Sequence, residues 1–258
     1  KRTLSDKMKS IDESVKSFSK QIIDQNKNSF VATFIRATQE IEVPDPPKDA
    51  KGNVTDSFFQ YRYYRTHYFD NFNISDPRLL RTPLYEDKLL TYVDKVIPQI
   101  PDTIMFEVDK IIEKSRTSPE VFRYVLITLF THYGKSQIMG FEDIALYIAD
   151  KYYLKEATWS DSTYLKKLKK QVEAKKPTML GKVAPDIDLI EVPSEHFISA
   201  IDDTAEKRNV YVGKPFKLSQ YTKDYTILYF WDTDCGHCKK ETPIMYEVYK
   251  RLKDKNVQ

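Results

Sequence analysis

The chain has 258 residues and a mass of 30.4 kDa, a length that allows one large domain or two of ordinary size. Hydrophobic residues make up 41% of it and charged residues 31%, so it can bury real cores and does not belong to the disordered class. The net charge of +3 gives no field that would hold a polyanion, so nucleic acid is not an expected partner. Only 6 glycines stand against 18 Tyr, 14 Phe and 2 Trp, which favours long packed helices over a turn-rich β protein.

Two features bear on membrane insertion and targeting. The longest apolar stretches, such as Val125–Phe130 and Ile227–Trp231, fall far below the ~20 residues that a membrane span requires. We therefore expect no transmembrane segment. The first residue is Lys1 rather than Met, and no apolar segment follows it, so we expect any signal or lipoprotein segment to have been removed before this point.

The first part of the chain shows the apolar spacing of helices. From Leu4 to about Gln39 apolar residues recur every three or four positions, with a break near residues 26–28, which predicts two amphipathic helices. The proline-rich residues 43–47 exclude helix and predict a linker or surface loop. Helical patterning then resumes in six segments: Thr55–Phe69, Pro83–Ile97, Pro101–Ser115, Ser118–Tyr133, Phe141–Tyr153 and Ser160–Lys175.

The pattern changes near Lys175–Pro177, where we place a domain boundary between residues 178 and 179. Gly181–Leu189 and Tyr211–Leu218 are typical of short extended segments. The β-branched and aromatic run Thr226–Trp231 predicts a fully buried strand. Helical spacing follows it directly, so the predicted local order is strand, turn, helix.

The turn between that strand and that helix contains both cysteines of the chain, Cys235 and Cys238. A zinc site would need two further Cys or His ligands, but no third cysteine exists, and His67, His132 and His196 are scattered singly. A redox dithiol explains the C-x-x-C spacing better. If a helix begins at Cys235, its thiolate meets the free N–H groups and positive end of that helix, and Cys238 lies one turn further in.

The residues from 225 to 243, YTILYFWDTDCGHCKKETP, resemble the thioredoxin-like thiol–disulfide oxidoreductases, in particular the extracytoplasmic TlpA/ResA-like branch. Trp231 stands four positions before the first cysteine and Pro243 eight after it, as in the family pattern. The upstream stretch Gly181–Asp186 is also similar to that branch.

The first half resembles a helical domain of uncharacterised role that precedes such thioredoxin-like domains in secreted proteins of Bacteroidetes type. The resemblance depends on Phe59–Tyr64, Asp76–Pro83 and Ala157–Asp161. We therefore expect a multi-domain α and α/β fold. An irregular all-α helical bundle over residues 1–178 precedes an incomplete thioredoxin-like α/β domain over residues 179–258.

The resemblance assigns roles to the residues of the motif. Cys235 is the attacking thiol, which forms a mixed disulfide with substrate, and Cys238 is the resolving thiol. His237, which follows Gly236, places a donor and, when protonated, a positive charge beside the thiolate. We expect it to lower the pKa of Cys235. The Gly-His pair is like that of protein disulfide isomerase, which implies a reduction potential nearer about −180 mV than the roughly −270 mV of thioredoxin.

Two further residues have supporting roles by the same resemblance. Trp231 is expected to pack beside the active-site turn, and Pro243 to kink the helix because it removes a backbone donor. The resemblance implies no metal and no cofactor other than the redox-active disulfide between Cys235 and Cys238.

The sequence departs from the family at three points. Tyr229 stands where many thioredoxins have a buried acid that assists proton transfer from the resolving thiol, so that step needs another group or water. Asp234 directly precedes Cys235, and its charge would oppose thiolate formation if it lay near the sulfur. The chain ends at Gln258, 20 residues after Cys238, so we expect the later strands and the cis-proline loop of the fold to be missing and the chain to be a poor catalyst.

One region of the helical half is rich in aromatic and basic side chains. Residues 58–72 hold eight Phe and Tyr residues with Arg62, Arg65 and His67 between them. Such a mixture could bind a peptide, a glycan or a nucleobase. The alternative interpretation, a helix buried on two sides, is the more common role of aromatic residues.

The resemblance implies an oxidoreductase of the periplasm or cell envelope, a reductase or isomerase that exchanges disulfides with protein substrates. Its expected partners are those substrates and a membrane or periplasmic electron donor. The alternative is a non-enzymatic scaffold in which the helical domain binds a partner and the dithiol is vestigial.

Overall fold

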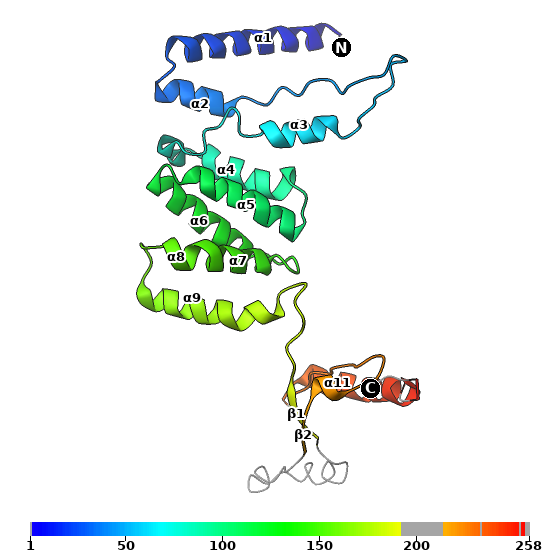
Figure 1. The fold of residues 1–258 in the computed structure, drawn as a ribbon. Helices are drawn as coiled ribbons and strands as arrows, with labels where there is room; N and C mark the ends of the chain where they lie inside the picture. The colour runs from blue at the N-terminus through cyan, green and yellow to red at the C-terminus, as the bar shows by residue number, and fades with distance from the viewer. Residues whose placement is uncertain (1, 192–213, 233, 253, 256–258) are drawn as a thin grey trace. The chain divides into compact units, whose positions relative to one another are not determined.

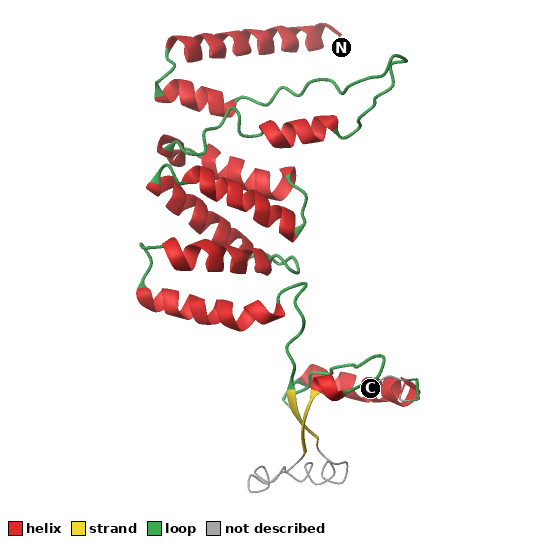
Figure 2. Ribbon diagram, in the orientation of Figure 1, coloured by secondary structure: helices red, strands yellow, loops and turns green. Residues whose placement is uncertain are grey.

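The computed structural model describes residues 2–191, 214–232, 234–252 and 254–255. The chain forms two compact units, which are residues 1–182 (unit 1) and 183–258 (unit 2). The regular elements of unit 1 are helices, joined by loops, whereas unit 2 combines a short sheet with one long helix (Figure 1, Figure 2). The expected order, all-α followed by mixed α/β, is therefore confirmed.

Unit 1 begins with the two predicted amphipathic helices. Helix α1 covers Arg2–Gln25 and α2 covers Phe30–Thr38. Ser29 caps α2, because its side-chain oxygen accepts a hydrogen bond from the backbone N–H of Ala32 at 3.1 Å. The two helices pack on each other, which buries Ile23 near the end of α1.

The proline-rich segment after α2 is a loop, as predicted. The next helix begins four residues later than predicted, at Phe59 instead of Thr55. Thr55 is held in the loop by its N–H, which donates to the carbonyl oxygen of Pro47 at 2.9 Å. Asp56 then accepts from the N–H of Phe58 at 3.1 Å, and helix α3 covers only Phe59–His67. The prediction of a helix from Thr55 was wrong at its start, because Thr55 and Asp56 form these loop contacts and the first α-helical hydrogen bond runs from the N–H of Arg62 to the carbonyl of Phe58.

The remaining helices of unit 1 follow one another in chain order along a stack (Figure 1). Their bounds are η1 Pro77–Arg81, α4 Leu84–Thr91, η2 Tyr92–Val96, α5 Pro101–Ser115, α6 Pro119–Gly134, α7 Glu142–Ile148, η3 Ala149–Tyr153, α8 Leu154–Glu156, α9 Ser162–Lys175 and η4 Lys176–Thr178. Their starts follow ordinary capping chemistry: Ser118 and Asp161 accept backbone N–H bonds at the beginnings of α6 and α9. Their inward faces form one continuous apolar core, with Ile104, Leu126 and Ile144 fully buried.

Two turns of the stack, η2 and η3, are π-helical and extend α4 and α7. Each carries a tyrosine that donates to a carboxylate of α5. Tyr92 in η2 bonds to Glu107 at 3.0 Å, and Tyr152 in η3 bonds to Asp109 at 2.7 Å. The two π turns thus join α4 and α7 to α5 through polar contacts as well as through the apolar core.

Glu107 is a buried acid with a full set of partners. It is 5% exposed and accepts from Arg65 at 2.7 Å, from Lys110 at 3.2 Å and from Tyr92. Burial alone would raise the pKa of Glu107, but these three donors outweigh that effect and hold it below its ordinary value. The carboxylate therefore stays charged and fixes α3 against α5.

Asp109, two residues further along α5, has a second set of donors. Tyr147, Lys151 and Tyr152 lie 2.6–2.7 Å from its oxygens. Burial favours a higher pKa for Asp109, yet the hydrogen bonds from Lys151 and the two tyrosines leave it lowered. This contact ties α5 to α7 and η3.

Unit 2 contains an antiparallel pair of strands and the helix α11. Strand β1 covers Asp188–Glu191, strand β2 covers Lys214–Lys217, and α11 covers Gly236–Leu252. The register pairs Asp188 with Lys217 and Glu191 with Lys214. Just before β1, the Asp186 carboxylate accepts from the N–H and hydroxyl of Ser219 at 2.9 and 2.8 Å, which closes this end of the ladder and lowers the pKa of Asp186.

The predicted buried strand at Thr226–Trp231 was wrong. These residues lie outside any strand, and the side chains of Ile227–Trp231 are 43–82% exposed. A strand needs a neighbour that takes its backbone hydrogen bonds, and within the described residues β1 and β2 pair only with each other. Of the predicted extended segment Tyr211–Leu218, residues 211–213 lie outside the described residues.

No helix in the part of the chain that the structure describes combines the length and the apolar character needed to cross a bilayer.

Candidate redox site

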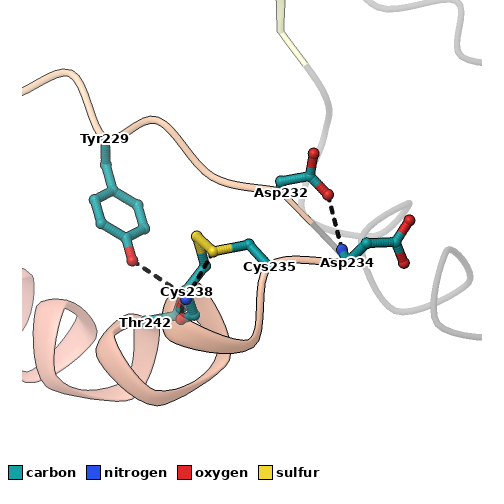
Figure 3. Close-up of a disulfide and its surroundings, with 6 residues drawn as sticks. All are labelled: Tyr229, Asp232, Asp234, Cys235, Cys238 and Thr242. Carbon is teal, nitrogen blue, oxygen red and sulfur yellow. Dashed lines mark hydrogen bonds between the residues drawn. A yellow bond between two sulfur atoms is a disulfide. The ribbon is translucent and has the colours of Figure 1, made fainter.

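The site begins with a turn that delivers Cys235 to the start of α11. The carboxylate of Asp232 accepts from the N–H of Asp234 at 2.7 Å, and the Asp232 carbonyl accepts from the N–H of Cys235 at 3.3 Å (Figure 3). The Cys235 carbonyl in turn accepts from the N–H of Lys239 at 3.2 Å, which is the first hydrogen bond of the helix. Cys235 is therefore the N-cap residue of α11.

Cys235 and Cys238 form a disulfide across this first turn, with their Cα atoms 5.3 Å apart (Figure 3). The N–H of Cys238 points at the sulfur of Cys235, at 3.2 Å. At an N-cap this donor is one of the free N–H groups of the helix, so it stabilises negative charge on that sulfur. Cys235 therefore becomes the better stabilised thiolate when the pair is reduced, and Cys238 follows it into the helix as a half-buried second thiol.

A chain of two hydroxyl groups lies beside Cys238. The Thr242 hydroxyl donates to the carbonyl oxygen of Cys238 at 2.6 Å, and the Tyr229 hydroxyl lies 3.2 Å from the Thr242 oxygen (Figure 3). Because the Thr242 proton is already donated, Tyr229 is the donor between the two. This contact places the Tyr229 phenol on the Cys238 side of the disulfide.

Thr242 was not among the residues that the sequence singled out. The signal was nevertheless present: a threonine four residues after Cys238 in a helix can return its hydroxyl to the carbonyl one turn earlier. Only the partner Tyr229, on a separate segment, depends on the folded structure.

The structure places the other candidate residues around the same turn. Gly236 and His237 are the first two residues of α11 and are exposed, and Pro243 lies inside the helix. Trp231 is 53% exposed, four residues before the disulfide. The roles expected for His237, Trp231 and Pro243 stay predictions.

The alternative zinc site has no donor set in the described part of the chain, where no group of three or more His, Cys, Asp or Glu side chains could hold a metal. His67 bonds to Asp70 at 2.6 Å, and His132 bonds to Asp94 at 2.8 Å, both in unit 1. His196 lies outside the described residues.

The aromatic region at residues 58–72 does not form a helix buried on two sides, so that interpretation was wrong. None of the residues of α3 is buried, and Phe58 just before it is 67% exposed. Burial begins after the helix, at Tyr68 and Phe72. The helix is instead held by polar contacts such as that from Arg65 to Glu107, because the loop before it supplies no second packing layer.

Comparison with known protein families matched both units. The AhpC/TSA family model matches residues 181–258, and the model of a domain of unknown function, DUF5106, matches residues 3–177. A search of curated proteins found no match. A thioredoxin-like protein from Bacteroides caccae, known from a crystal structure, is 17% identical to this chain, with a TM-score of 0.48 and coverage of 85% of this chain and 72% of that one.

The AhpC/TSA match confirms the expected thioredoxin-like character of the C-terminal part and indicates a redox function in general terms. The DUF5106 match covers more than half of the residues. The chain belongs to the DUF5106 family, and its residues 181–258 match the AhpC/TSA family model.

Proposed function

We propose that this protein is a thiol–disulfide oxidoreductase of the cell envelope, of the TlpA/ResA-like and Bacteroidetes type, that acts on protein disulfides through Cys235 and Cys238. The observation that carries the proposal is the pairing of these two cysteines at the start of α11, with the N–H of Cys238 directed at the sulfur of Cys235. A thiol at this position is the one that a helix N-terminus activates.

The exchange proceeds in two balanced steps. The Cys235 thiolate attacks one sulfur of a substrate disulfide, so that a mixed disulfide forms and the other substrate sulfur leaves as a thiolate. Cys238 then loses its proton and attacks the sulfur of Cys235, which closes the Cys235–Cys238 disulfide and releases the second substrate thiolate. Two electrons pass to the substrate, its two thiolates take up protons, and a membrane or periplasmic dithiol donor reduces the protein again.

Insulin reduction by the chain, driven by dithiothreitol, tests the reaction. We expect slow development of turbidity from the released insulin chain, loss of this activity in Cys235→Ser, and accumulation of a covalent mixed disulfide in Cys238→Ser. Lys250→Ala, near the far end of α11, serves as the matched control and should react like the parent. Equal turnover by Cys235→Ser would contradict the proposal and would leave the helical unit, as a binding scaffold, the functional part.

The direction of exchange follows from the reduction potential. Equilibration of the Cys235–Cys238 pair in glutathione buffers, read by thiol labelling, should give a value nearer about −180 mV than −270 mV. His237→Pro should shift the potential toward the more reducing value, because it removes the donor and the charge beside the thiolate. An unchanged reduction potential in His237→Pro would show that His237 does not influence the cysteine pair.

A further inference from the structure

Helix α1 carries an apolar stripe that the rest of unit 1 leaves open. Leu4, Met8, Ile11, Val15 and Phe18 are 57–67% exposed. The stripe is covered only at its end, where α1 packs on α2 and Ile22 is half-buried. Contiguous apolar patches of this kind on a soluble domain mark an interaction surface.

The spacing of the stripe identifies the kind of partner. From Leu4 to Ile22, successive stripe residues are 4, 3, 4, 3 and 4 positions apart. In heptad letters, Met8, Val15 and Ile22 occupy position a and Leu4, Ile11 and Phe18 occupy position d. This repeat of 3.5 residues is the pattern of a coiled coil, in which an apolar seam faces another helix along its whole length. Helix α1, with 24 residues, is long enough for three such heptads.

The charges beside the stripe favour a parallel pair of identical helices. Lys7 occupies position g and Asp12 position e. In a parallel pair, position g of one helix faces position e of the next heptad of its partner, so Lys7 meets Asp12 of the second copy on both sides of the seam. In an antiparallel pair with the stripes in register, Asp12 would face the same aspartate of the second copy and repel it.

The attachment of α1 to unit 1 favours the same orientation. Lys16 Nζ lies 3.2 Å from Glu42, and Ile23 is buried against α2. Both residues occupy position b, to one side of the stripe. A parallel two-fold pair therefore puts the two helical units on opposite sides of the seam, whereas an antiparallel pair puts both on the same side, where they would compete for space.

We propose that α1 pairs with α1 of a second copy of this chain in a parallel two-stranded coiled coil, so that the protein is a two-fold symmetric dimer. The interface is the stripe from Leu4 to Ile22 with Lys7 and Asp12 at its edges. The dimer lies outside the redox site and is independent of the chemistry proposed for it.

Sedimentation equilibrium on the whole chain tests the proposal. The expected mass is twice 30.4 kDa, and Ile11→Glu/Val15→Glu should give the monomer mass. Ser10→Glu/Ser17→Glu, at position c on the outer face of the same helix, adds the same charge and should leave the dimer intact. Circular dichroism of both variants checks that the helices remain folded. A monomer over the whole concentration range, or a dimer indifferent to Ile11→Glu/Val15→Glu, would overturn the proposal.

The orientation is tested by charge reversal and by cross-linking. Lys7→Glu alone and Asp12→Lys alone should weaken dimerisation about two- to five-fold, and the double variant should restore it. In a Cys235→Ser/Cys238→Ser background, Leu4→Cys should form an intermolecular disulfide on oxidation, since an antiparallel pair would hold those two residues roughly 27 Å apart. Absence of this cross-link overturns the parallel arrangement. Binding of monomers to anionic lipid vesicles through the stripe, lost in Ile11→Glu/Val15→Glu, would overturn the dimer and assign the stripe to a membrane surface.

Discussion

Unit 1 and unit 2 differ in where their apolar side chains lie. In unit 1 the inward faces of α5, α6 and α7 are fully buried, and the acids among them have hydrogen-bonding partners. In unit 2 no described residue of α11 is buried, and residues 227–231 are largely exposed. The first unit thus has an extensive core and no assigned chemistry, whereas the second has the redox pair and little burial.

The difference follows from how each unit obtains its packing partners. Neighbours in the helical stack are also neighbours in sequence, as with α5 and α6 or α6 and α7. A strand such as the one expected at Thr226–Trp231 instead depends on partners that are distant in sequence. Local helical packing can therefore build a core from consecutive residues, and an apolar strand pattern cannot do so alone.

Truncation of one apolar side chain in each unit should give the largest difference in the free energy of unfolding. Leu126→Ala removes a fully buried side chain from α6 and should lower the free energy of unfolding by about 2–5 kcal/mol, measured by urea titration with circular dichroism. Leu228→Ala, at a side chain that is 43% exposed, should change it by less than about 0.5 kcal/mol. Similar losses in the two variants would show that residues 226–231 are buried in solution and would remove the contrast.

Replacement of Glu107, the buried acid of α5, should change the free energy of unfolding less than Leu126→Ala does. Glu107→Gln leaves Arg65, Lys110 and Tyr92 around a neutral acceptor and should cost about 1–3 kcal/mol of unfolding free energy. Glu113→Gln, which breaks an exposed pair with Arg116, is the matched control and should cost less than about 1 kcal/mol. Equal costs would mean that burial adds nothing to the role of Glu107.

The same acids predict a pH dependence. The pKa values of Glu107 and Asp109 are lowered in the folded protein, so their contribution to stability is fully present above the ordinary carboxyl values of about 4. It is lost as the pH falls through the lower folded values. The urea midpoint should therefore drop below about pH 4, and Glu107→Gln/Asp109→Asn should lose less over that range. An identical acid profile in the double variant would assign the loss to other carboxylates.

The smallest expected effect lies in unit 2. Asp234 directly precedes Cys235, and a negative charge near a sulfur opposes thiolate formation there. Asp234→Asn should therefore speed iodoacetamide labelling of the reduced Cys235 at pH 7 by about two- to five-fold at most, measured as the rate of labelling. Lys255→Gln, also in unit 2, is a control that should leave the labelling profile unchanged. Slower labelling in Asp234→Asn would mean that Asp234 acts through the turn it forms with Asp232 and not through its charge.

Most of the helices could be predicted from sequence because the required signals are local. Ser118 and Pro119 start α6, and the break near residues 26–28 separates α1 from α2. The start of α3 could not be predicted from sequence. It depends on the contact between Thr55 and Pro47, which joins residues across a loop. The π turns were also missed, because each continues an α-helical apolar pattern with one extra residue.

The redox site also has a part that the sequence predicted and a part that it could not predict. The cysteine pair and its helix lie within a few residues of each other, so spacing alone predicted their order. The hydrogen bond between Tyr229 and Thr242 joins a separate segment to α11, and its geometry required the folded chain. The strand at Thr226–Trp231 failed for the same reason, since residue preference describes one strand and says nothing of its neighbour.

The polar contacts that Tyr92 and Tyr152 make with α5 depend on the number of residues in the π turns η2 and η3. A π turn is an α-helix with one residue inserted, and each residue of a helix accounts for about 100° of rotation. Deletion of a single residue from η2 or η3 would turn the two halves of the helix against each other and swing Tyr92 or Tyr152 away from its acid on α5. These contacts are therefore set by chain length as much as by side-chain identity, and a one-codon deletion would disconnect them while every participating residue was retained.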